Sequence, residues 1–401
     1  MMTRRKVVRV AALGIGILAL VLVSTGSGIA AEKVLKFGQI GVMSGPAAAW
    51  GLNNKYSCLA TAQMYNEKGG FEIDGEKYRI EIVSVDDKND PKLTVSGAER
   101  LIHQEGVKYI VGPNIDPTAV SMVPVVEAGK AINTAYSFER KIYSPPHHNT
   151  FLGMITSFQV APLLVPYLKK ERKVMSMSFI AWNVAEGIQT RNDTEKIAKS
   201  LGIKILSRDI TYEPGTTDFF PHMSKIVPGN PDAICLCNPT PAEAPLIIKA
   251  ARELGYKGIM FTQNAMDIKP MNEVAGEYAT GFISPGGAST PEIRSQYMED
   301  FVKVYTDIAG EWNDEAGTKV YALEMYLATL KIAGKKAIND VEVFKATVPK
   351  VKIKNPFLKE DRILQYKGMR DFKQLSQIGV PLVVNEIRNG EFKAIYIGEI
   401  E

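Results

Sequence analysis

The chain contains few of the side chains that form disulfides or bind metal ions. Its 401 residues include four histidines and three cysteines, Cys58, Cys235 and Cys237. Cys235 and Cys237 stand two residues apart in a predicted apolar strand, so their side chains face the same way and a bridge between them would be strained. Cys58 is distant in sequence. We therefore expect three buried free thiols, no disulfide and no metal site.

Sequence motifs of common catalytic and phosphate-binding sites are also missing. The chain has no Gly-x-x-x-x-Gly-Lys-Ser/Thr loop, and Ser44 is not the centre of a Gly-x-Ser-x-Gly turn. Gly38, Gly41 and Gly45 do not have the Gly-x-Gly-x-x-Gly spacing of a dinucleotide site. The adjacent pair His147-His148 follows two prolines and is poorly placed to converge on one metal ion. We expect neither enzymatic activity nor a cofactor.

The chain has one long apolar run, which lies at the N-terminus. Four basic side chains fall within residues 4–9, an apolar stretch follows at 11–23, and small residues occupy much of 28–31. This order is typical of a cleaved signal peptide, which we assign to residues 1–31. A retained membrane anchor is the alternative, although the run is short for a spanning helix. The signal peptide predicts a periplasmic protein.

Once the signal peptide is removed, the chain has no excess of positive or negative charge. The whole chain has 48 basic and 44 acidic residues, and residues 1–31 contain four basic residues and no acidic one, which leaves 44 of each. A neutral protein gives no indication of a nucleic-acid or lipid partner. About 370 remaining residues exceed one typical domain, so we expect two.

Predicted strands and helices alternate along the chain, and the pattern starts twice. Such alternation is typical of an α/β fold with two Rossmann-like lobes, each with a parallel sheet. Asn389-Gly390 indicates a hairpin near the end. Strands are predicted at 34–41, 78–85, 108–111, 131–137, 174–181, 204–211, 233–237, 258–262, 377–387 and 391–397, and helices at 52–68, 91–104, 116–128, 186–200, 219–226, 242–254, 291–309 and 313–333.

Two segments near the start of the first lobe are especially informative. The first predicted strand ends in a Gly/Ser/Pro turn at residues 41–46 that leads directly to Trp50, and the helix that follows ends at residues 65–70. This layout presents backbone N–H groups, a hydroxyl and an indole at the carboxyl edge of a sheet, where open α/β folds bind ligands.

Several motifs, taken in order, resemble the periplasmic solute-binding proteins of the branched-chain amino acid (Leu/Ile/Val) type, which capture a small molecule for an ABC transporter. The matching segments are Met-Ser-Gly-Pro…Trp-Gly at 43–51, Asn-Glu-Lys-Gly-Gly at 66–70, Asp-Asp-Lys-Asn-Asp-Pro at 86–91, and residues 106–113, 212–219 and 231–233. The resemblance implies two lobes joined by a hinge of three crossings, with the ligand in the cleft between them. It places lobe 1 at 32–153 plus 286–358 and lobe 2 at 154–285 plus 359–401. It also implies a monomer that works with an inner-membrane permease.

The resemblance suggests ligand contacts from lobe 1. Trp50 falls where the family has an aromatic ring over the ligand, with lobe packing as the alternative, and Ser44 is a further candidate. The loop from Asn114 to Asp116 falls where a serine helps to hold the ligand's carboxylate. Because an aspartate would repel a carboxylate, either Asp116 caps the helix that follows or the ligand differs.

A second lobe 1 segment, Tyr136-Ser137-Phe138, falls where the family grips the carboxylate with backbone and hydroxyl groups. Ser137 keeps the hydroxyl, while Tyr136 and Phe138 add aromatic rings. Since side chains alternate along a strand, one of these two rings is expected to turn into the core.

In lobe 2 the resemblance suggests contacts from Trp182, Asn183, Asn238 and Thr240. Gln263 falls where amino acid binders have a glutamate that neutralises the ligand's ammonium group. Gln263 is uncharged, and a buried ammonium group without its counter-ion costs about 3–5 kcal/mol. A branched-chain amino acid is therefore disfavoured as the ligand.

These observations predict a periplasmic component of an ABC importer that clamps a small organic solute and delivers it to a permease. An aromatic or other organic acid is the first choice of ligand, an amide- or urea-type solute the second, and a short amino acid the third. A periplasmic ligand sensor with the same clamp is the alternative function.

Overall fold

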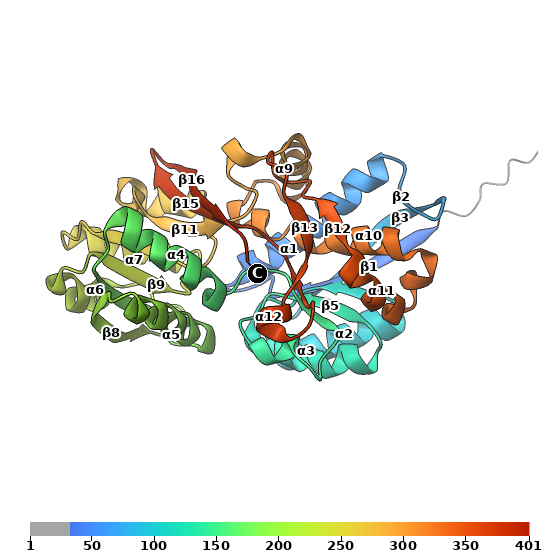
Figure 1. Cartoon of the computed structure of the whole chain (residues 1–401), viewed down its shortest axis with the longest axis horizontal. Helices are drawn as coiled ribbons and strands as arrows, with labels where there is room; N and C mark the ends of the chain where they lie inside the picture. Colours follow the sequence, from blue (N-terminus) through green and yellow to red (C-terminus); the bar gives the residue numbers. More distant parts are fainter. Residues whose placement is uncertain (1–32, 401) are drawn as a thin grey trace, which may run out of the picture. The chain divides into compact units, whose positions relative to one another are not determined.

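Two β-sheets organise the chain, and each forms the centre of one lobe (Figure 1). The computed structural model describes residues 33–400, so the predicted signal peptide lies outside the described residues. Within residues 33–400, none of the helices has the length and apolar character needed to cross a membrane.

The first sheet has nine strands, and its central strands are parallel. β1 pairs in parallel with β3 and β4, and β5 pairs in parallel with β4 and β6, whereas β2, β12 and β13 are antiparallel to their neighbours. The order across the sheet is β12 (Lys352–Lys354), β13 (Ile363–Lys367), β14 (Gln377–Ile378), β6 (Thr150–Leu152), β5 (Ile132–Ala135), β4 (Tyr109–Val111), β1 (Val34–Gly41), β3 (Glu76–Asp86) and β2 (Phe71–Ile73).

The second sheet has seven strands, of which β15 and β16 are antiparallel to their neighbours. The order is β16 (Glu391–Gly398), β15 (Leu382–Arg388), β11 (Ile283–Gly286), β10 (Ile259–Thr262), β9 (Ala233–Cys237), β7 (Ser176–Trp182) and β8 (Lys204–Tyr212). The predicted hairpin is confirmed: Asn389 and Gly390 join β15 to β16 with φ values of 53° and 74°, as a tight two-residue turn requires.

Helices accompany each sheet, as expected for parallel strands that are buried on both faces. In lobe 1, α9 packs on α1, and α10 packs on α1 and β4, although they are far apart in sequence (Figure 1). Lobe 1 has α1 (Ala48–Glu67), α2 (Pro91–Glu99), α3 (Asp116–Ala128), α9 (Gln296–Ala309), α10 (Tyr321–Ala333), α11 (Val341–Thr347) and α12 (Met369–Phe372). Lobe 2 has α4 (Ser157–Arg172), α5 (Ala185–Ser200), α6 (Phe220–Ile226), α7 (Glu243–Glu253) and the short α8 (Ile268–Pro270).

The chain passes between the two sheets three times. The crossings follow β6, β11 and β14, at residues 153–156, 287–295 and 379–381. The third crossing differs from the expected boundary at residue 359, because β13 and β14 pair within the first sheet. The predicted strand 377–387 is thus two strands in different sheets, separated at Gly379 and Pro381, where a proline without an N–H group suits the interruption.

Buried side chains fill both lobes. In lobe 1 the ring of Phe37 stacks on the ring of Tyr326 with centroids 6.3 Å apart, and the ring centroids of Tyr109 and Phe344 are 4.9 Å apart. The three cysteines are free and buried, as predicted, and the Sγ atoms of Cys235 and Cys237 are 3.7 Å apart on one face of β9. These cores hold the carboxyl ends of the strands in fixed positions.

Candidate functional site

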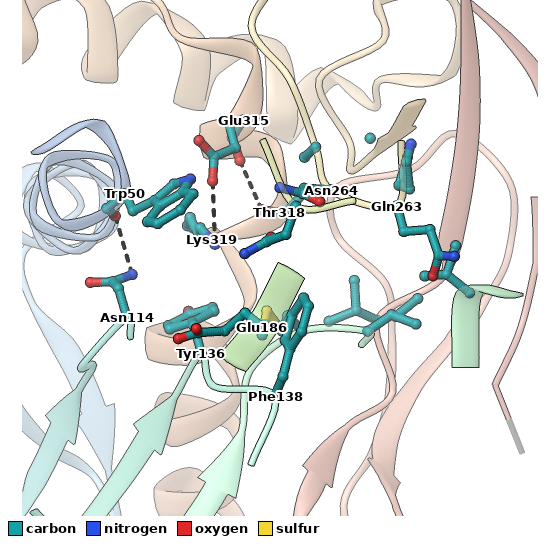
Figure 2. Close-up of a pocket in the computed structure, with 18 of the residues that line it drawn as sticks. Trp50, Asn114, Tyr136, Phe138, Glu186, Gln263, Asn264, Glu315, Thr318 and Lys319 are labelled. Carbon is teal, nitrogen blue, oxygen red and sulfur yellow. Dashed lines mark hydrogen bonds and ion pairs between the residues drawn. The ribbon is translucent and has the colours of Figure 1, made fainter. Parts of the chain in front are cut away.

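A cavity lies where the carboxyl ends of strands from both sheets come together. It has a volume of about 850 Å³, counting its opening to solvent. We call it the interlobe cavity. Its lining comprises Trp50, Asn114, Ile115, Tyr136, Phe138, Met154, Ile155, Val160, Trp182, Glu186, Asn238, Gln263, Asn264, Ala265, Pro285, Gly286, Glu315, Thr318, Lys319, Val380, Pro381 and Leu382 (Figure 2).

The lining follows from the topology of the two sheets. Residues just beyond β4, β5, β9 and β10, and at the ends of β7 and β11, reach the cavity, as open α/β sheets place ligands beyond their carboxyl ends. Each of the three crossings also contributes residues to the lining, either its own or those next to it. These include Met154, Gly286 and Val380. The cavity therefore contacts both lobes and the segments that join them.

Four aromatic rings form much of the wall. Trp50 on α1 and Phe138 after β5 are half-buried, whereas Tyr136 and Trp182 are buried. Trp50 and Trp182 come from different lobes, and their rings meet edge to face with centroids 6.3 Å apart. Edge-to-face rings are a favourable aromatic arrangement, so the two indoles link the lobes at the cavity.

A buried ion pair lies in the lobe 1 part of the wall. Glu315 lies in the 3-10 turn Asp314–Thr318, and Lys319 follows one turn later, with its Nζ atom 3.6 Å from Glu315 Oε1 (Figure 2). The Lys319 ammonium also lies 4.3 Å from the centre of the Tyr136 ring. Burial raises the pKa of Glu315 to about 7, and burial lowers the pKa of Lys319.

A second acidic side chain, Glu186, lies in the lobe 2 part of the wall at the start of α5. Its Oε1 atom accepts a hydrogen bond of 3.0 Å from the backbone N–H of Asp116 in lobe 1. Burial, followed by the charge of Glu186, raises the pKa of Asp116 to about 6. In the described part of the chain, no cationic side chain forms an ion pair with Glu186 or Asp116 in this structure.

Seven of the residues expected to contact a ligand line the interlobe cavity. Trp50 and Gln263 line the same cavity from opposite lobes. Tyr136 and Phe138 both reach it, although Tyr136 also belongs to the lobe 1 core. The seven are Trp50, Asn114, Tyr136, Phe138, Trp182, Asn238 and Gln263.

The other five expected contacts lie outside the lining. Ser44 is exposed on its turn, and Asn183 is exposed and donates to Glu213 Oε1 at 2.6 Å. Thr240 is buried, and its backbone N–H donates to the Glu243 carboxylate at the start of α7. The remaining two residues, Asp116 and Ser137, are joined by a hydrogen bond between their side chains.

Of the two alternatives for Asp116, the capping role is wrong. The N-cap of α3 is Ile115, and Asp116 is the first residue of the helix. Its carboxylate instead accepts hydrogen bonds from the Ser137 hydroxyl at 2.6 Å and from the Phe138 N–H at 2.7 Å. Asp116 therefore holds the segment that carries Tyr136 and Phe138, and the Ser137 hydroxyl is already used.

Several buried polar atoms of lining residues lack hydrogen-bond partners within residues 33–400. They include the indole N–H of Trp182, the hydroxyl of Tyr136 and Oε1 of Gln263. The Nε2 group of Gln263 donates to the Thr194 hydroxyl on α5. Buried polar groups are almost always paired, so these atoms are available to a solute or to water.

No pattern in the sequence indicates Glu315, Lys319 or Glu186 as lining residues. A glutamate four residues before a lysine in a predicted helix is typical of a solvent-facing pair. Glu186 follows Trp182 and Asn183, the residues expected to contact a ligand, and is the second residue of α5. Within residues 33–400, no group of three His, Cys, Asp or Glu side chains is arranged to hold a metal ion.

Comparison with known proteins finds relatives and solved structures of solute-binding proteins. A Leu/Ile/Val-binding protein homologue from Brucella abortus (strain 2308) is 26% identical over 219 residues, which cover 53% of each chain. The chain thus spans about half the length of the curated relatives it matches. Two solved structures share the fold: a leucine-binding protein from Thermotoga maritima and an ABC transporter solute-binding protein from R. palustris in complex with benzoate.

These structures align over nearly the whole chain. The Thermotoga maritima protein has 19% identity and a TM-score of 0.74, covering 91% of this chain and 98% of its own. The R. palustris protein has 16% identity and a TM-score of 0.75, covering 92% and 97%. The sequence profile described as periplasmic binding protein matches residues 34–371. The chain therefore belongs to the periplasmic binding protein family, a family of binding proteins rather than enzymes.

Proposed function

We propose that this protein is the solute-binding component of an ABC importer and that it clamps a small aromatic or other organic acid in the interlobe cavity. The observation that carries this proposal is the lining: four aromatic rings surround a space in which Lys319 is the only cationic side chain among the lining residues of the described chain. The solute would then pass to an inner-membrane permease.

The aromatic wall favours a flat, apolar body in the ligand. Each well-placed pair of aromatic rings contributes about 0.5–1.5 kcal/mol beyond the burial of apolar area. Trp50 and Trp182 lie on different lobes, so a ring held by both would stabilise the closed arrangement of the lobes. Ligand binding then favours closure because the ligand contacts both lobes only when they are together.

The polar groups favour an acid over a branched-chain amino acid. Gln263 is uncharged and donates to Thr194, so it offers no counter-ion to an ammonium group at that position. The R. palustris protein, seen with benzoate, is consistent with an aromatic acid on this fold, whereas the Thermotoga maritima protein is a leucine-binding protein. The fold alone accommodates either ligand, and the lining of this chain favours the aromatic acid.

A second candidate ligand is an aromatic amino acid. Glu186 lines the cavity without a cationic partner in the described chain, and a ligand ammonium group would supply one. A periplasmic ligand sensor that uses the same clamp remains the alternative function. A permease and an ATPase encoded beside this gene would favour the importer, and a signalling protein encoded there would favour the sensor.

A thermal-shift screen of the exported protein tests the proposal. The screen compares benzoate and hydroxybenzoates with phenylalanine, leucine, isoleucine, valine and simple amides. The largest rise in melting temperature is expected for an aromatic acid, because a bound ligand stabilises the folded state by RT ln(1 + [L]/Kd). A larger rise with leucine, isoleucine or valine than with every organic acid would contradict it. The Trp50→Ala variant, which removes one wall of the cavity, serves as a control for specific binding.

A further inference from the structure

The charges that line the interlobe cavity present a problem for an anionic ligand. The lining includes two carboxylates, Glu186 and Glu315, and one ammonium group, that of Lys319. If all three are ionised, the wall already has one excess negative charge, and a bound organic acid adds another. An uncompensated charge inside a protein is expensive, so one negative charge has to be neutralised when the acid binds.

Lys319 is well placed to receive the ligand's carboxylate. Its ammonium group has three N–H donors, and the structure gives it one ionic partner, Glu315 at 3.6 Å, together with the face of the Tyr136 ring. The side chain is only 7% exposed, yet it belongs to the cavity lining (Figure 2). A carboxylate in the cavity would therefore compete with Glu315 for the same cation.

Other elements surround Glu315 with groups that do not compensate its charge. The Nδ2 group of Asn53 on α1 donates to Glu315 Oε2 at 3.4 Å, and the Tyr305 hydroxyl on α9 donates to Asn53. The carboxylate of Asp267, from the segment between β10 and α8, repels the charge of Glu315. Lys319 is thus the only cation recorded beside Glu315 in the described chain, and losing it would favour the protonated carboxyl group.

The acid–base behaviour of Glu315 agrees with this geometry. Burial is the largest cause that raises the pKa of Glu315, the charge of Lys319 opposes it, and the charge of Asp267 adds a smaller rise, so that the pKa is about 7. Glu315 therefore exchanges its proton in the pH range in which a solute-binding protein can be assayed, and removal of Lys319 as a partner would raise the pKa again.

We propose that Lys319 recognises the ligand's carboxylate and that Glu315 takes up one proton from solvent as the ligand binds. The proton forms an O–H bond on Glu315, and the ionic contact between Lys319 and Glu315 is replaced by one between Lys319 and the ligand. The cavity gains one anion and one proton, so its net charge does not change. This inference rests on the proposed function and adds the residue that determines selectivity for anions.

Calorimetric titration of the exported protein with benzoate, in buffers of different ionisation enthalpy, tests the inference. At pH 8 we expect the uptake of nearly one proton for each benzoate bound, and little uptake at pH 5.5, where Glu315 is already protonated. Affinity should then fall by up to about tenfold for each pH unit above 8. Benzamide, which has the same ring without the charge, should bind without proton uptake.

Substitutions assign the two roles. Glu315→Gln should abolish proton uptake and strengthen benzoate binding at pH 8, because the amide resembles the protonated carboxyl group. Lys319→Met should weaken benzoate binding at least tenfold while changing benzamide binding less. Since Lys319→Met leaves a buried carboxylate unpaired, the double variant Glu315→Gln/Lys319→Met provides a form without that charge, and it should show the same preference for benzamide.

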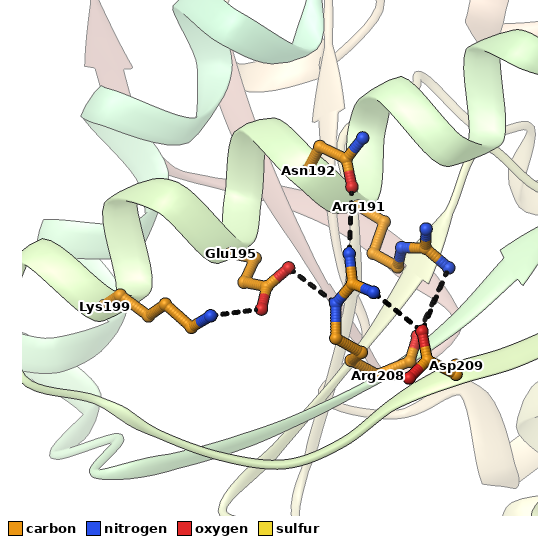
Figure 3. A network of polar contacts seen from close by, with 6 residues as sticks. All are labelled: Arg191, Asn192, Glu195, Lys199, Arg208 and Asp209. Carbon is orange, nitrogen blue, oxygen red and sulfur yellow. Dashed lines mark hydrogen bonds and ion pairs between the residues drawn. The ribbon is translucent and has the colours of Figure 1, made fainter.

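A matched control comes from a glutamate–lysine pair away from the cavity. Glu195 on α5 lies 2.7 Å from Lys199 and 2.9 Å from Arg208 (Figure 3). Despite its burial, hydrogen bonds from these two cations lower the pKa of Glu195, and it does not line the interlobe cavity. Glu195→Gln should therefore leave both the affinity for benzoate and the proton uptake unchanged.

The outcomes separate the two proposals. Benzoate binding without proton uptake at pH 8 would overturn the inference and leave the proposed function standing. If proton uptake persists in Glu315→Gln but disappears in Glu186→Gln, Glu315 is not the group that takes up the proton. Failure of every aromatic and other organic acid to bind at both pH 5.5 and pH 8 would overturn the proposed function and the inference together.

Discussion

Trp50 and Trp182 show how single residues link the two lobes. One follows β1 and the other ends β7, and their rings are 6.3 Å apart. The third tryptophan, Trp312, is outside the lining and donates its indole N–H to Asp314 at 2.8 Å. Two of the three tryptophans are thus positioned to report ligand binding.

Trp50→Ala is expected to weaken benzoate binding by about tenfold or more, because it removes both apolar contact area and an aromatic pair. Trp50→Phe should retain most of the affinity. Intrinsic fluorescence should change on ligand addition in the wild type, and the change should be smaller in Trp50→Phe. If Trp50→Ala binds as well as the wild type, the aromatic wall is not part of the binding site.

The Tyr136 hydroxyl is buried and lacks a partner within residues 33–400, whereas the Tyr326 hydroxyl donates to the Ile110 carbonyl at 2.9 Å and accepts a hydrogen bond from the Thr134 hydroxyl at 2.8 Å. Tyr136→Phe should therefore leave the free energy of unfolding unchanged or slightly higher. Tyr326→Phe should lower it by about 1–2 kcal/mol. Urea denaturation measures both, and equal losses would show that Tyr136 has a partner in solution.

At the scale of elements, close backbone contacts fix where helices begin beside the cavity. Gly187 lies in the first turn of α5, and a Cβ atom added there would stand 2.1 Å from the Trp182 carbonyl oxygen. This contact brings the start of α5, with Glu186, against the end of β7. Position 187 therefore requires glycine for steric reasons.

For Gly187→Ala we predict a loss of stability of about 1–3 kcal/mol and weaker benzoate binding, since Trp182 and Glu186 would both move. Gly229→Ala is the matched control because a Cβ atom there meets nothing within 4 Å. That variant should stay within about 0.5 kcal/mol of the wild type. Thermal denaturation and ligand titration of both variants measure the difference, and equal behaviour would contradict the close contact at position 187.

Most elements could be predicted from the sequence, because their periodicity is local. The predicted helix 116–128 and strands 34–41 and 233–237 agree with α3, β1 and β9. The predicted strand 377–387 was wrong because its two halves pair with different sheets, which local pattern does not encode. β6, β11 and α4 were not assigned, although residues just after β6 and at the end of β11 contribute to the cavity.

The candidate site was predictable where a residue directly follows a strand. Tyr136 and Gln263 meet that condition, and Trp182 is the last residue of β7. Lys319 and Glu315 do not, because they belong to the long segment after β11 and reach the cavity only through the packing of lobe 1. The contact between Asp116 and Ser137 joins two segments 21 residues apart, and no local pattern indicates it.

For the whole molecule, buried carboxyl groups predict how stability depends on pH. Burial is the largest cause that raises the pKa values of Asp87, Asp116 and Asp267 to about 6 and that of Glu315 to about 7. In the unfolded chain these groups ionise near pH 4. Between about pH 4.5 and 7 the folded protein therefore binds more protons than the unfolded chain, and stability falls as pH rises.

The free energy of unfolding without ligand should accordingly be higher at pH 5.5 than at pH 8, by on the order of 1–2 kcal/mol for each such group. Denaturant titrations at the two pH values measure the difference. Asp116→Asn removes one of the four groups and should reduce the difference. A protein that is more stable at pH 8 than at pH 5.5 would show that these carboxyl groups do not control its pH dependence.

A crystal structure of the exported protein with the aromatic acid that stabilises it most tests the central claim directly. We expect the ring of the ligand in contact with both Trp50 and Trp182, and its carboxylate within hydrogen-bond distance of Lys319. Both lobes should contact the ligand at once. A ligand bound by one lobe alone, or bound outside the cavity lined by Trp50, Trp182 and Lys319, would contradict the account.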